Sequence, residues 1–544
     1  MDQPSQPKLK LFVSALSGKG RALRRAPKVA ALLRSQGWNV DVRVTHRSDD
    51  PAALAAACTN HWVAVLGGDG YIARIATQVG ARGGVVIPLP GGSTLGLSPM
   101  VLLLIPAGIY YTLRTKFLPI RMFREMISVL IEKPDSKMQG DLSKGKLSGL
   151  QTLIVSTATR VGMGNLVGVV AAISGGGAGA VFWMWITALI GSSTAFIEAT
   201  LAQLHKRKDP LYGGFRGGPA YYIHDFFFKN KPGEKLEEGI PKKKSIIAVL
   251  FALSGLICWA GISQVIGNSV SSAFKNAFSI KPLISSILLV LIAAVIVLRK
   301  NATARVLDVI VPVMAGLYFA MTVFVILTHL PALPRVFERI FSEAFGLRQI
   351  VSGGFAAVLM NGVKRGLFSN EAGSGSAPCA AAAADTDHPV KMGLFQAIGV
   401  FIDTIVLCSC TAFIMLLTPE GMIKDLQGMD ILQMAMNYHF GAFGKIFIAV
   451  ILWLFSFSTF LGILFYARSN VSYLFGDNWT SQTAYKIFAL IMLFVGGLAQ
   501  YTVVWDLGDV GIGLMTIFNL LVMYPLSKEA LSSLKDFEEK RKTA

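Results

Sequence analysis

The feature that most constrains this chain is a series of long apolar segments that begins near residue 97 and continues almost to the C-terminus. Each is long enough, at 1.5 Å of helix rise per residue, to cross the ~30 Å hydrocarbon core of a bilayer. Eleven segments can be counted, at residues 97–114, 148–173, 178–204, 245–271, 282–298, 306–329, 347–363, 392–418, 441–466, 485–500 and 508–526. Only 15% of the residues are charged, against about a quarter in soluble domains. The sequence therefore predicts an all-α polytopic membrane protein with about eleven transmembrane helices.

Basic residues in the connecting loops predict the orientation of these helices. Residues 114–146 hold eight Lys or Arg and residues 206–244 hold ten, whereas the loops at 174–179 and 500–509 hold none. Because positively charged loops stay in the cytoplasm, we expect a cytoplasmic C-terminus and a first span that begins outside a bacterial inner membrane. The formal net charge of +19 then reflects these loops and not nucleic-acid binding.

The second apolar segment contains the stretch Val161-Gly162-Met163-Gly164-Asn165 at membrane depth. Glycine and asparagine interrupt a helix there, and irregular backbone is tolerated at this depth only around an enclosed or watery cavity. Broken helices of this kind form transporter sites, in which half-helix N-termini face a substrate carboxylate and freed carbonyls coordinate Na⁺. Close helix packing through the glycines is the alternative.

A second interruption occurs at Gly353 and Gly354, in the seventh apolar segment. If the first segment is set aside, the two interruptions lie in the first and sixth of ten spans. This is the pattern of two inverted five-helix repeats that each open with a broken helix. The pairing favours a binding site at both interruptions.

Five ordered blocks resemble the alanine/glycine:cation symporters, a family with the leucine-transporter type of inverted-repeat fold. They are GKLSGLQTLIVSTATRVGMGNLVG at 145–168, GAVFWMWITALIGSSTAFIE at 179–198, FRGGPAYYI at 215–223, GVKRGLFSNEAGSGSAP at 362–378 and GVFIDT at 399–404. The resemblance covers residues 97–540. It implies alternating-access transport of a small neutral amino acid, alanine or glycine, with Na⁺ as the coupling ion and no other cofactor.

The resemblance also assigns the substrate residues. Residues 162–165 would bind the amino acid through backbone groups and the Asn165 amide, and Gly353 and Gly354 would help to enclose its side chain. Met163 stands where the family often has a small hydroxyl residue, which bears on substrate preference.

Sodium would bind between the first broken helix and the ninth span. The sodium ligands would be Val161 and Gly164 on the broken helix and Ser458 and Thr459 on the ninth span. Hydroxyl oxygens are hard ligands that suit Na⁺. The alternative is that each hydroxyl bonds back to its own helix.

Two acidic residues, Glu198 and Asp403, lie within apolar segments, where an ionised side chain is costly and marks function. We expect Asp403 in a functional network. Glu198 is either a gating residue or the partner of a loop Lys or Arg. Asn370 and Glu371 are expected in a cytoplasmic loop that contributes to the inner gate.

The first 95 residues have a different pattern. Apolar, β-branched runs at 8–16, 39–46, 61–68 and 83–90 alternate with helical stretches, the order that builds a parallel sheet. Three glycine turns resemble the start of the diacylglycerol kinase/sphingosine kinase-like catalytic domain, at 17–20 (SGKG), at Gly67-Gly68-Asp69-Gly70 and at 88–94 (PLPGGST). Such turns let backbone N–H groups approach phosphates.

The kinase-like pattern stops after its nucleotide loop. Tyr71 replaces the usual Thr, and the lipid-binding lobe has no counterpart in the chain. The expected topology places this segment outside the cell, where ATP is scarce. We therefore expect residues 1–95 to be an inactive, vestigial or artificial fusion to a transporter domain at 97–544. A membrane-tethered lipid kinase and an inactive fusion product remain the alternatives.

Overall fold

The computed structural model divides into two compact units, Met1–Ser98 with Ser342–Met360, and Pro99–Phe341 with Asn361–Ala544. Each is described by itself. The residues that the structure describes are 8–15, 21–35, 38–46, 49–67, 75, 78–79, 85–90, 98–131, 160–236, 238–298, 305–345, 354–423 and 426–543.

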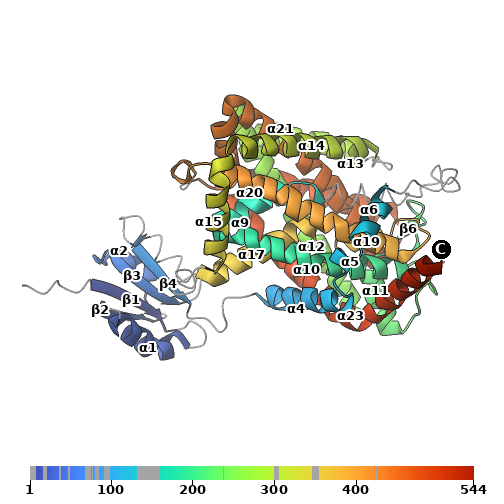
Figure 1. Cartoon of the computed structure of the whole chain (residues 1–544), viewed down its shortest axis with the longest axis horizontal. Coiled ribbons are helices and arrows are strands. Elements are labelled where there is room, and N and C mark those ends of the chain that lie inside the picture. The colour runs from blue at the N-terminus through green and yellow to red at the C-terminus, as the bar shows by residue number, and fades with distance from the viewer. Residues whose placement is uncertain are drawn as a thin grey trace, which may run out of the picture. The chain divides into compact units, whose positions relative to one another are not determined.

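The N-terminal unit is built on a parallel sheet, as predicted. Its strands are β1 (Lys8–Ser14), β2 (Asn39–Thr45), β3 (Trp62–Gly67) and β4 (Val85–Pro90), in the order β2-β1-β3-β4. Helix α1 (Arg21–Ser35) packs apolar side chains against one face, and α2 (Pro51–Ala56) lies against the other (Figure 1). Of the first glycine loop nothing is described, and the second begins at the end of β3.

The second unit is helical, with only a two-stranded antiparallel ribbon among its described residues. Its elements in chain order are α4 (Pro99–Arg114), α5 (Leu118–Arg121), α6 (Phe123–Ile131), η2 (Gly164–Gly168), α9 (Val169–Gly176), α10 (Gly179–Leu204), β5 (Arg207–Lys208), β6 (Phe215–Arg216), α11 (Pro219–Phe228), α12 (Ile246–Phe278), α13 (Pro282–Val297), α14 (Arg305–Thr328), η3 (Leu330–Ala332), α15 (Leu333–Phe345), α17 (Gly354–Asn370), α18 (Ala377–Ala381), α19 (Pro389–Phe401), η4 (Ile402–Cys408), α20 (Ser409–Leu416), η5 (Glu420–Met422), α21 (Met429–Phe475), α22 (Trp479–Leu498) and α23 (Tyr501–Thr543).

Each expected span overlaps a helix, but not all of these helices could cross a membrane by length and composition. In the described part of the chain six are long and apolar enough, or seven if the pair Val313–Thr328 and Leu330–Phe345, bent by 78°, is one span. Three shorter apolar helices lie at Pro99–Arg114, Gly164–Gly176 and Pro282–Val297. The mostly helical, multi-span architecture is thus confirmed, while eleven spans and a five-plus-five repeat stay predictions.

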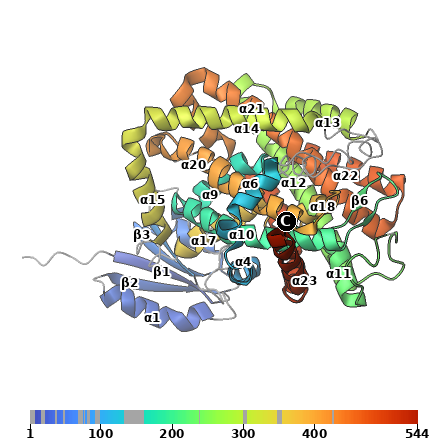
Figure 2. The same ribbon diagram turned by 45° about the vertical axis from the view of Figure 1, so that its right-hand side comes forward.

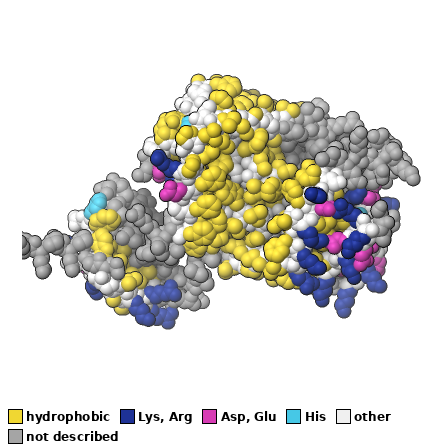
Figure 3. Space-filling view, viewed as in Figure 1, with side chains coloured by type: hydrophobic (Ala, Val, Ile, Leu, Met, Phe, Trp, Pro, Cys, Tyr) yellow, Lys and Arg dark blue, Asp and Glu magenta, His cyan; other side chains and the backbone are white. Residues whose placement is uncertain are grey.

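Helix α12 is the centre of one group of helices, because α21, α22 and α23 all pack along it. In a second group, α10 packs on α19, and α6 also contacts α19 (Figure 2). Side chains on the surface are hydrophobic over a broad band of this unit, and charged ones gather at the end that carries α11 and the last turns of α23 (Figure 3). The band is what a lipid-facing surface requires.

Candidate functional site

The helix is interrupted at the glycine-rich stretch, as its sequence predicted. Arg160 is helical, residues 161–163 form a bend and a turn, and the π-helix η2 then leads into α9. The backbone N–H of Gly162 donates to the Asn165 Oδ1 atom at 3.0 Å, so the Asn165 side chain takes over a bond that a regular helix would supply. Residues 160–168 are all buried. Single π-helical turns often mark functional sites.

The Asn165 amide joins three separate elements. Its Nδ2 atom lies 2.7 Å from Asp403 Oδ1 in η4 and 3.3 Å from Ser369 Oγ near the end of α17. Ser369 donates to the other Asp403 oxygen at 2.8 Å, and Thr404 does so at 2.9 Å. In the described part of the chain, this buried carboxylate accepts hydrogen bonds from neutral donors, which satisfy its lone pairs at low dielectric.

The main chain of the broken helix has its own side-chain partners. The Met163 N–H donates to Thr459 Oγ1 in α21 at 3.1 Å. The Asn165 carbonyl accepts from Thr411 Oγ1 in α20 at 2.7 Å, and the Tyr318 hydroxyl of α14 lies 2.9 Å from the same Thr411 oxygen. Hydroxyl groups from two neighbouring helices thus pair with backbone groups at the break.

The glycines also permit close packing of helices, which was the alternative to a binding site at this stretch. A Cβ atom at Gly164 would lie 3.2 Å from the Ser369 Cα atom, and one at Gly168 would lie 3.3 Å from the Phe368 ring. The broken helix approaches α17 too closely for a larger residue at Gly164. Interruption and close approach occur together, since the Asn165 bonds need that proximity.

The two hydroxyls expected to bind sodium differ. Thr459 faces the break through Met163, whereas Ser458 Oγ donates back to the Phe455 carbonyl of its own helix at 2.9 Å. Val161 is buried in the bend of the broken helix. The structure thus brings Thr459 to the broken helix and leaves Ser458 in the helix-bonded arrangement.

Among the described residues, the partners of Glu198 are backbone and amide N–H groups and not a loop Lys or Arg. It is buried in α10, and its two carboxylate oxygens accept the backbone N–H groups of Gly373 at 2.9 Å and Gly375 at 3.0 Å. Asn519 of α23 donates to Glu198 Oε1 at 2.5 Å. Both glycines have a positive φ, 97° and 85°, a region that favours glycine. The carboxylate therefore fixes the conformation of the segment that follows α17.

The same region contains Asn370 and Glu371, the residues expected in a cytoplasmic loop of the inner gate, and both are buried. Asn370 is the last residue of α17 and fully buried, and its Nδ2 atom donates to Thr404 Oγ1 at 3.2 Å. Glu371 is also buried and accepts from the Tyr466 hydroxyl at 3.1 Å. The helix breaks after residue 370, and the polar groups of that break point inward because protein side chains satisfy them.

Some predicted residues receive no structural description. Gly353 lies outside the described residues, and Gly354 is the first residue of α17. In the kinase-like loop Gly67 ends β3, whereas Gly68, Asp69 and Gly70 lie outside the described residues.

Sequence reasoning missed several residues of the site. They are Arg160, Tyr318, Ser369, Thr411 and Asn519. Arg160 is buried and donates to the Gln396 carbonyl at 3.1 Å, while its Nε and Nη2 atoms have no hydrogen-bond partner among the described residues. A polar side chain in an apolar run was the available signal, because such groups need partners at membrane depth. The described residues contain no group of three or more His, Cys, Asp or Glu placed to hold a metal.

Several known proteins are similar to this chain in sequence. A family model described as the sodium:alanine symporter family matches residues 92–544, and one described as the diacylglycerol kinase catalytic domain matches residues 8–111. The "Probable sodium/glutamine symporter GlnT" of Bacillus subtilis is 41% identical over 447 residues, 81% of this chain and 88% of the relative. The "Putative sodium/proton-dependent alanine carrier protein YrbD" of the same organism is 36% identical over 83% of this chain and 92% of the relative. The "Sodium/alanine symporter AgcS" of Methanococcus maripaludis is 34% identical over 81% and 95%.

Proposed function

Because the chain belongs to the sodium:alanine symporter family, we propose that it imports a small neutral amino acid, alanine or glycine, together with Na⁺ by alternating access. The observation that carries this proposal is the broken helix at 160–168, whose backbone groups and Asn165 amide are held by side chains of α17, η4, α20 and α21. Such a break offers the N–H groups and carbonyls that an amino acid and a cation need.

In this proposal the amino acid binds at residues 162–165, with its carboxylate at the N–H groups of the break and its side chain toward Gly353 and Gly354. The Met163 side chain, in place of a small hydroxyl group, would restrict the pocket and favour a small substrate. The 41% identical relative named for glutamine is the reason to test that amino acid as well.

We place the sodium ion between the break and α21. Carbonyl oxygens of Val161 and Gly164 and the hydroxyls of Ser458 and Thr459 are the proposed ligands, all hard oxygen donors. Thr459 already touches the break at Met163, and Ser458 would have to turn from its own helix to join the site. Asp403 holds Asn165 in place, and Glu198, with Asn370 and Glu371, fixes the segment after α17 and so acts in gating.

The proposed topology has eleven spans in a leucine-transporter-like five-plus-five repeat in a bacterial inner membrane, with the C-terminus in the cytoplasm. We propose that residues 97–544 are the transport domain and that residues 1–95 are an inactive kinase-like fragment. The lipid-kinase alternative rests on the second family match, at residues 8–111. Phosphorylation of diacylglycerol by the purified chain with ATP and Mg²⁺ would support that alternative.

The test is uptake of labelled alanine, glycine and glutamine by proteoliposomes with an imposed Na⁺ gradient, a proton gradient or neither. The proposal expects alanine or glycine uptake that needs the Na⁺ gradient. A relative named sodium/proton-dependent makes the proton arm necessary. Uptake that is indifferent to both gradients would overturn symport, and glutamine uptake alone would overturn the substrate.

A further inference from the structure

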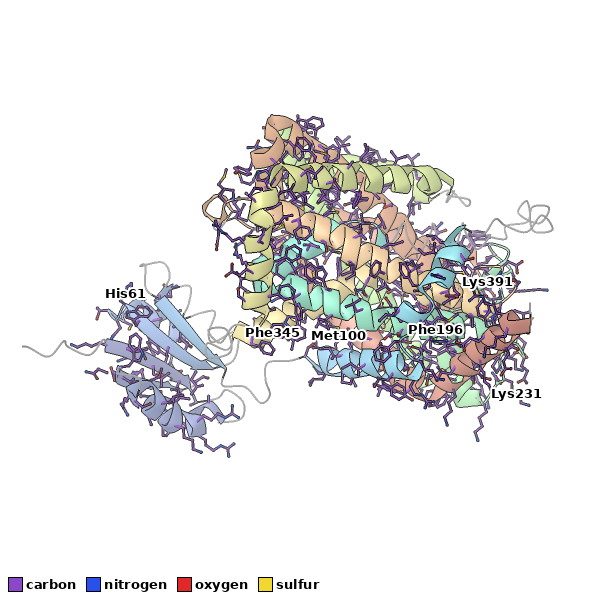
Figure 4. All side chains as sticks on the ribbon, viewed as in Figure 1. His61, Met100, Phe196, Lys231, Phe345 and Lys391 are labelled. Atoms are coloured by element: carbon purple, nitrogen blue, oxygen red, sulfur yellow. The ribbon has the colours of Figure 1, made fainter. Side chains whose placement is uncertain are left out.

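The C-terminal part of α23 is joined by ion pairs to several other elements of the helical unit. We call residues 529–541 of α23 the C-terminal clasp. Its pairs are Glu529 with His205 at 2.8 Å, Asp536 with His388 at 3.1 Å, Glu538 with Arg121 at 2.7 Å, and Arg541 with Glu125. All lie at the charge-rich end, which Lys231 and Lys391 mark in Figure 4. Exposed pairs contribute little to stability, so the pair that includes the buried His205 decides the strength of the clasp.

The pair of His205 with Glu529 has the least exposed side chains of the four. His205, the residue that follows α10, is buried, and Glu529 is partly exposed. Its Nδ1 atom lies 3.0 Å from Asp225 Oδ2 of α11, and its Nε2 atom lies 2.8 Å from Glu529 Oε2. Ionised carboxylates only accept hydrogen bonds, and a neutral imidazole has a single N–H. Both contacts are therefore hydrogen bonds only when His205 carries two protons. Deprotonation would leave one ring nitrogen lone pair against a carboxylate.

The charges around His205 lead to the same protonation state. Arg207 of β5 bonds Asp225 Oδ1 at 2.7 Å, and Asn230 also donates to that oxygen at 3.0 Å. The charged neighbours on the packed elements are thus Asp225, Arg207 and Glu529. Two carboxylates are balanced by Arg207 and a protonated His205, whereas a neutral His205 leaves the partly exposed Glu529 carboxylate without a charged partner in this cluster.

The pH range follows from these contacts. Burial lowers the pKa of His205, but its hydrogen bonds to Asp225 and Glu529 outweigh burial and raise the pKa above the ordinary histidine value. A raised pKa means that the contribution to the clasp is complete below about pH 6.5. It disappears as the pH rises through the raised value. The clasp is therefore tight in mild acid and loose in alkali.

The clasp adds to the packing between the two groups of helices. α23 packs along α12 and also directly on α10 and α19, which pack on each other, and α6 packs on α19. His205 follows α10, His388 precedes α19, and Arg121 and Glu125 belong to α5 and α6. Relative movement of the two groups must stretch or break these pairs.

We propose that the C-terminal clasp is a proton-controlled latch that holds the α10–α19 group against α23 when His205 is doubly protonated. Its consequence for transport rests on the proposed function, because only an alternating-access cycle would need the latch to open. The latch itself is a statement about α23 and can be tested without a substrate.

The first test is hydrogen–deuterium exchange of peptides from residues 527–543 in the purified full-length protein at pH 6.0 and pH 8.5, corrected for intrinsic rates. The wild type should exchange about tenfold faster at the higher pH. His205→Gln should exchange fast at both values. Equal protection of the wild type at both values, or a pH response that persists in His205→Gln, would overturn the latch.

A second variant covers the case in which His205→Gln does not fold. In Glu529→Gln, a neutral His205 can donate to Asp225 and accept from the new amide, so the clasp should stay closed and its pH response should fall below threefold. His329→Gln is the matched control, because His329 follows α14 and its described hydrogen-bond partners are Val325 and Thr328 of that helix, neither of which is a carboxylate. A full pH response in Glu529→Gln would also contradict the latch.

Transport is measured separately, as uptake by proteoliposomes of fixed internal pH. If the latch governs the cycle, Glu529→Gln should flatten the pH profile of uptake while the wild type keeps its slope. Exchange that responds to pH without any amino-acid uptake would retain the latch and reject the proposed function. Amino-acid uptake without a pH response in hydrogen–deuterium exchange would retain the proposed function and reject the latch.

Discussion

The two units of this chain bury different kinds of side chain. Around the N-terminal sheet the buried residues are apolar, among them Leu9, Leu11, Val13 and Val40, and Thr45 is the one polar residue buried in the described part of that segment. The helical unit buries carboxylates, amides, hydroxyls and arginines in its interior. Burial of a polar group is tolerated only with partners.

The kind of side chain that each unit buries distinguishes an ordinary packed core from a candidate site. The sheet has the core of an ordinary small α/β segment, and its phosphate-type glycine loops lie largely outside the described residues. The helical unit holds polar groups around Asp403, with partners from three helical elements, and around Glu198, with partners from α23 and the segment after α17. Retaining such groups at membrane depth is costly unless they serve the site.

Removal of the Asp403 carboxylate should produce the largest effect and would test the comparison most directly. Asp403→Ala leaves Asn165, Ser369 and Thr404 without their common acceptor. Each unpaired buried group costs about 1–3 kcal/mol, so uptake should fall at least about a hundredfold. Proteoliposome uptake, normalised to folded protein, is the measurement.

Asp403→Asn distinguishes shape from charge, because it keeps the size of the side chain. Asp387→Asn is the control, since Asp387 is exposed and its ion pair is with the nearby Lys391. If Asp403→Ala transported as well as the control, the buried polar cluster would be a packing feature and the contrast between the two units would carry no functional meaning.

The fold was predictable from simple patterns. The alternation of β-branched runs predicted β1 to β4, and apolar length predicted the positions of the long helices. The last span was expected at 508–526, but α23 continues to Thr543. Those extra turns are polar and amphipathic, so hydropathy cannot find them. Ion pairs join these turns to α5, α6 and the ends of α10 and α19.

The site was predictable only in part. Glycine and asparagine at 162–165 indicated a break, and Asp403 stood out as an acid in an apolar run. Asn165 contacts Ser369 and Asp403 because three helical elements pack together. Both residues lie more than 200 positions from Asn165 in the sequence, and no local pattern encodes such a contact. Burial of Glu371 likewise follows from Tyr466, far along the chain.

The next effect concerns the two hydroxyls of α21. Thr459→Val removes the acceptor of the Met163 N–H and a proposed sodium ligand. The Na⁺ concentration for half-maximal uptake should rise about tenfold, the equivalent of one lost hydrogen bond to a charged group. Ser458→Ala is the matched variant, and its effect should be smaller because Ser458 bonds its own helix. A larger effect at Ser458 would reverse the assignment.

A smaller effect is expected at Glu198. Glu198→Gln keeps the shape but exchanges an acceptor oxygen for an N–H group that faces a backbone N–H of Gly373 or Gly375. The unfolding free energy should fall by about 1–3 kcal/mol, seen as a lower melting temperature in detergent. Glu420→Gln, an exposed change, should leave it unaltered. An unchanged melting temperature in Glu198→Gln would show that the Gly373–Gly375 segment does not depend on the carboxylate.

The smallest effect should come from removing the N-terminal segment altogether. Deletion of residues 1–95 retains α4 and nearly all of the region that matches the symporter family, at 92–544. It also retains every hydrogen bond of the Asp403 and Glu198 clusters, because none of these involves a residue before 160. Uptake per folded molecule should therefore change by less than about twofold. A loss greater than tenfold, with the protein still monodisperse and its melting temperature unchanged, would mean that the sheet takes part in transport. In that case an apolar core alone would not mark a segment as dispensable.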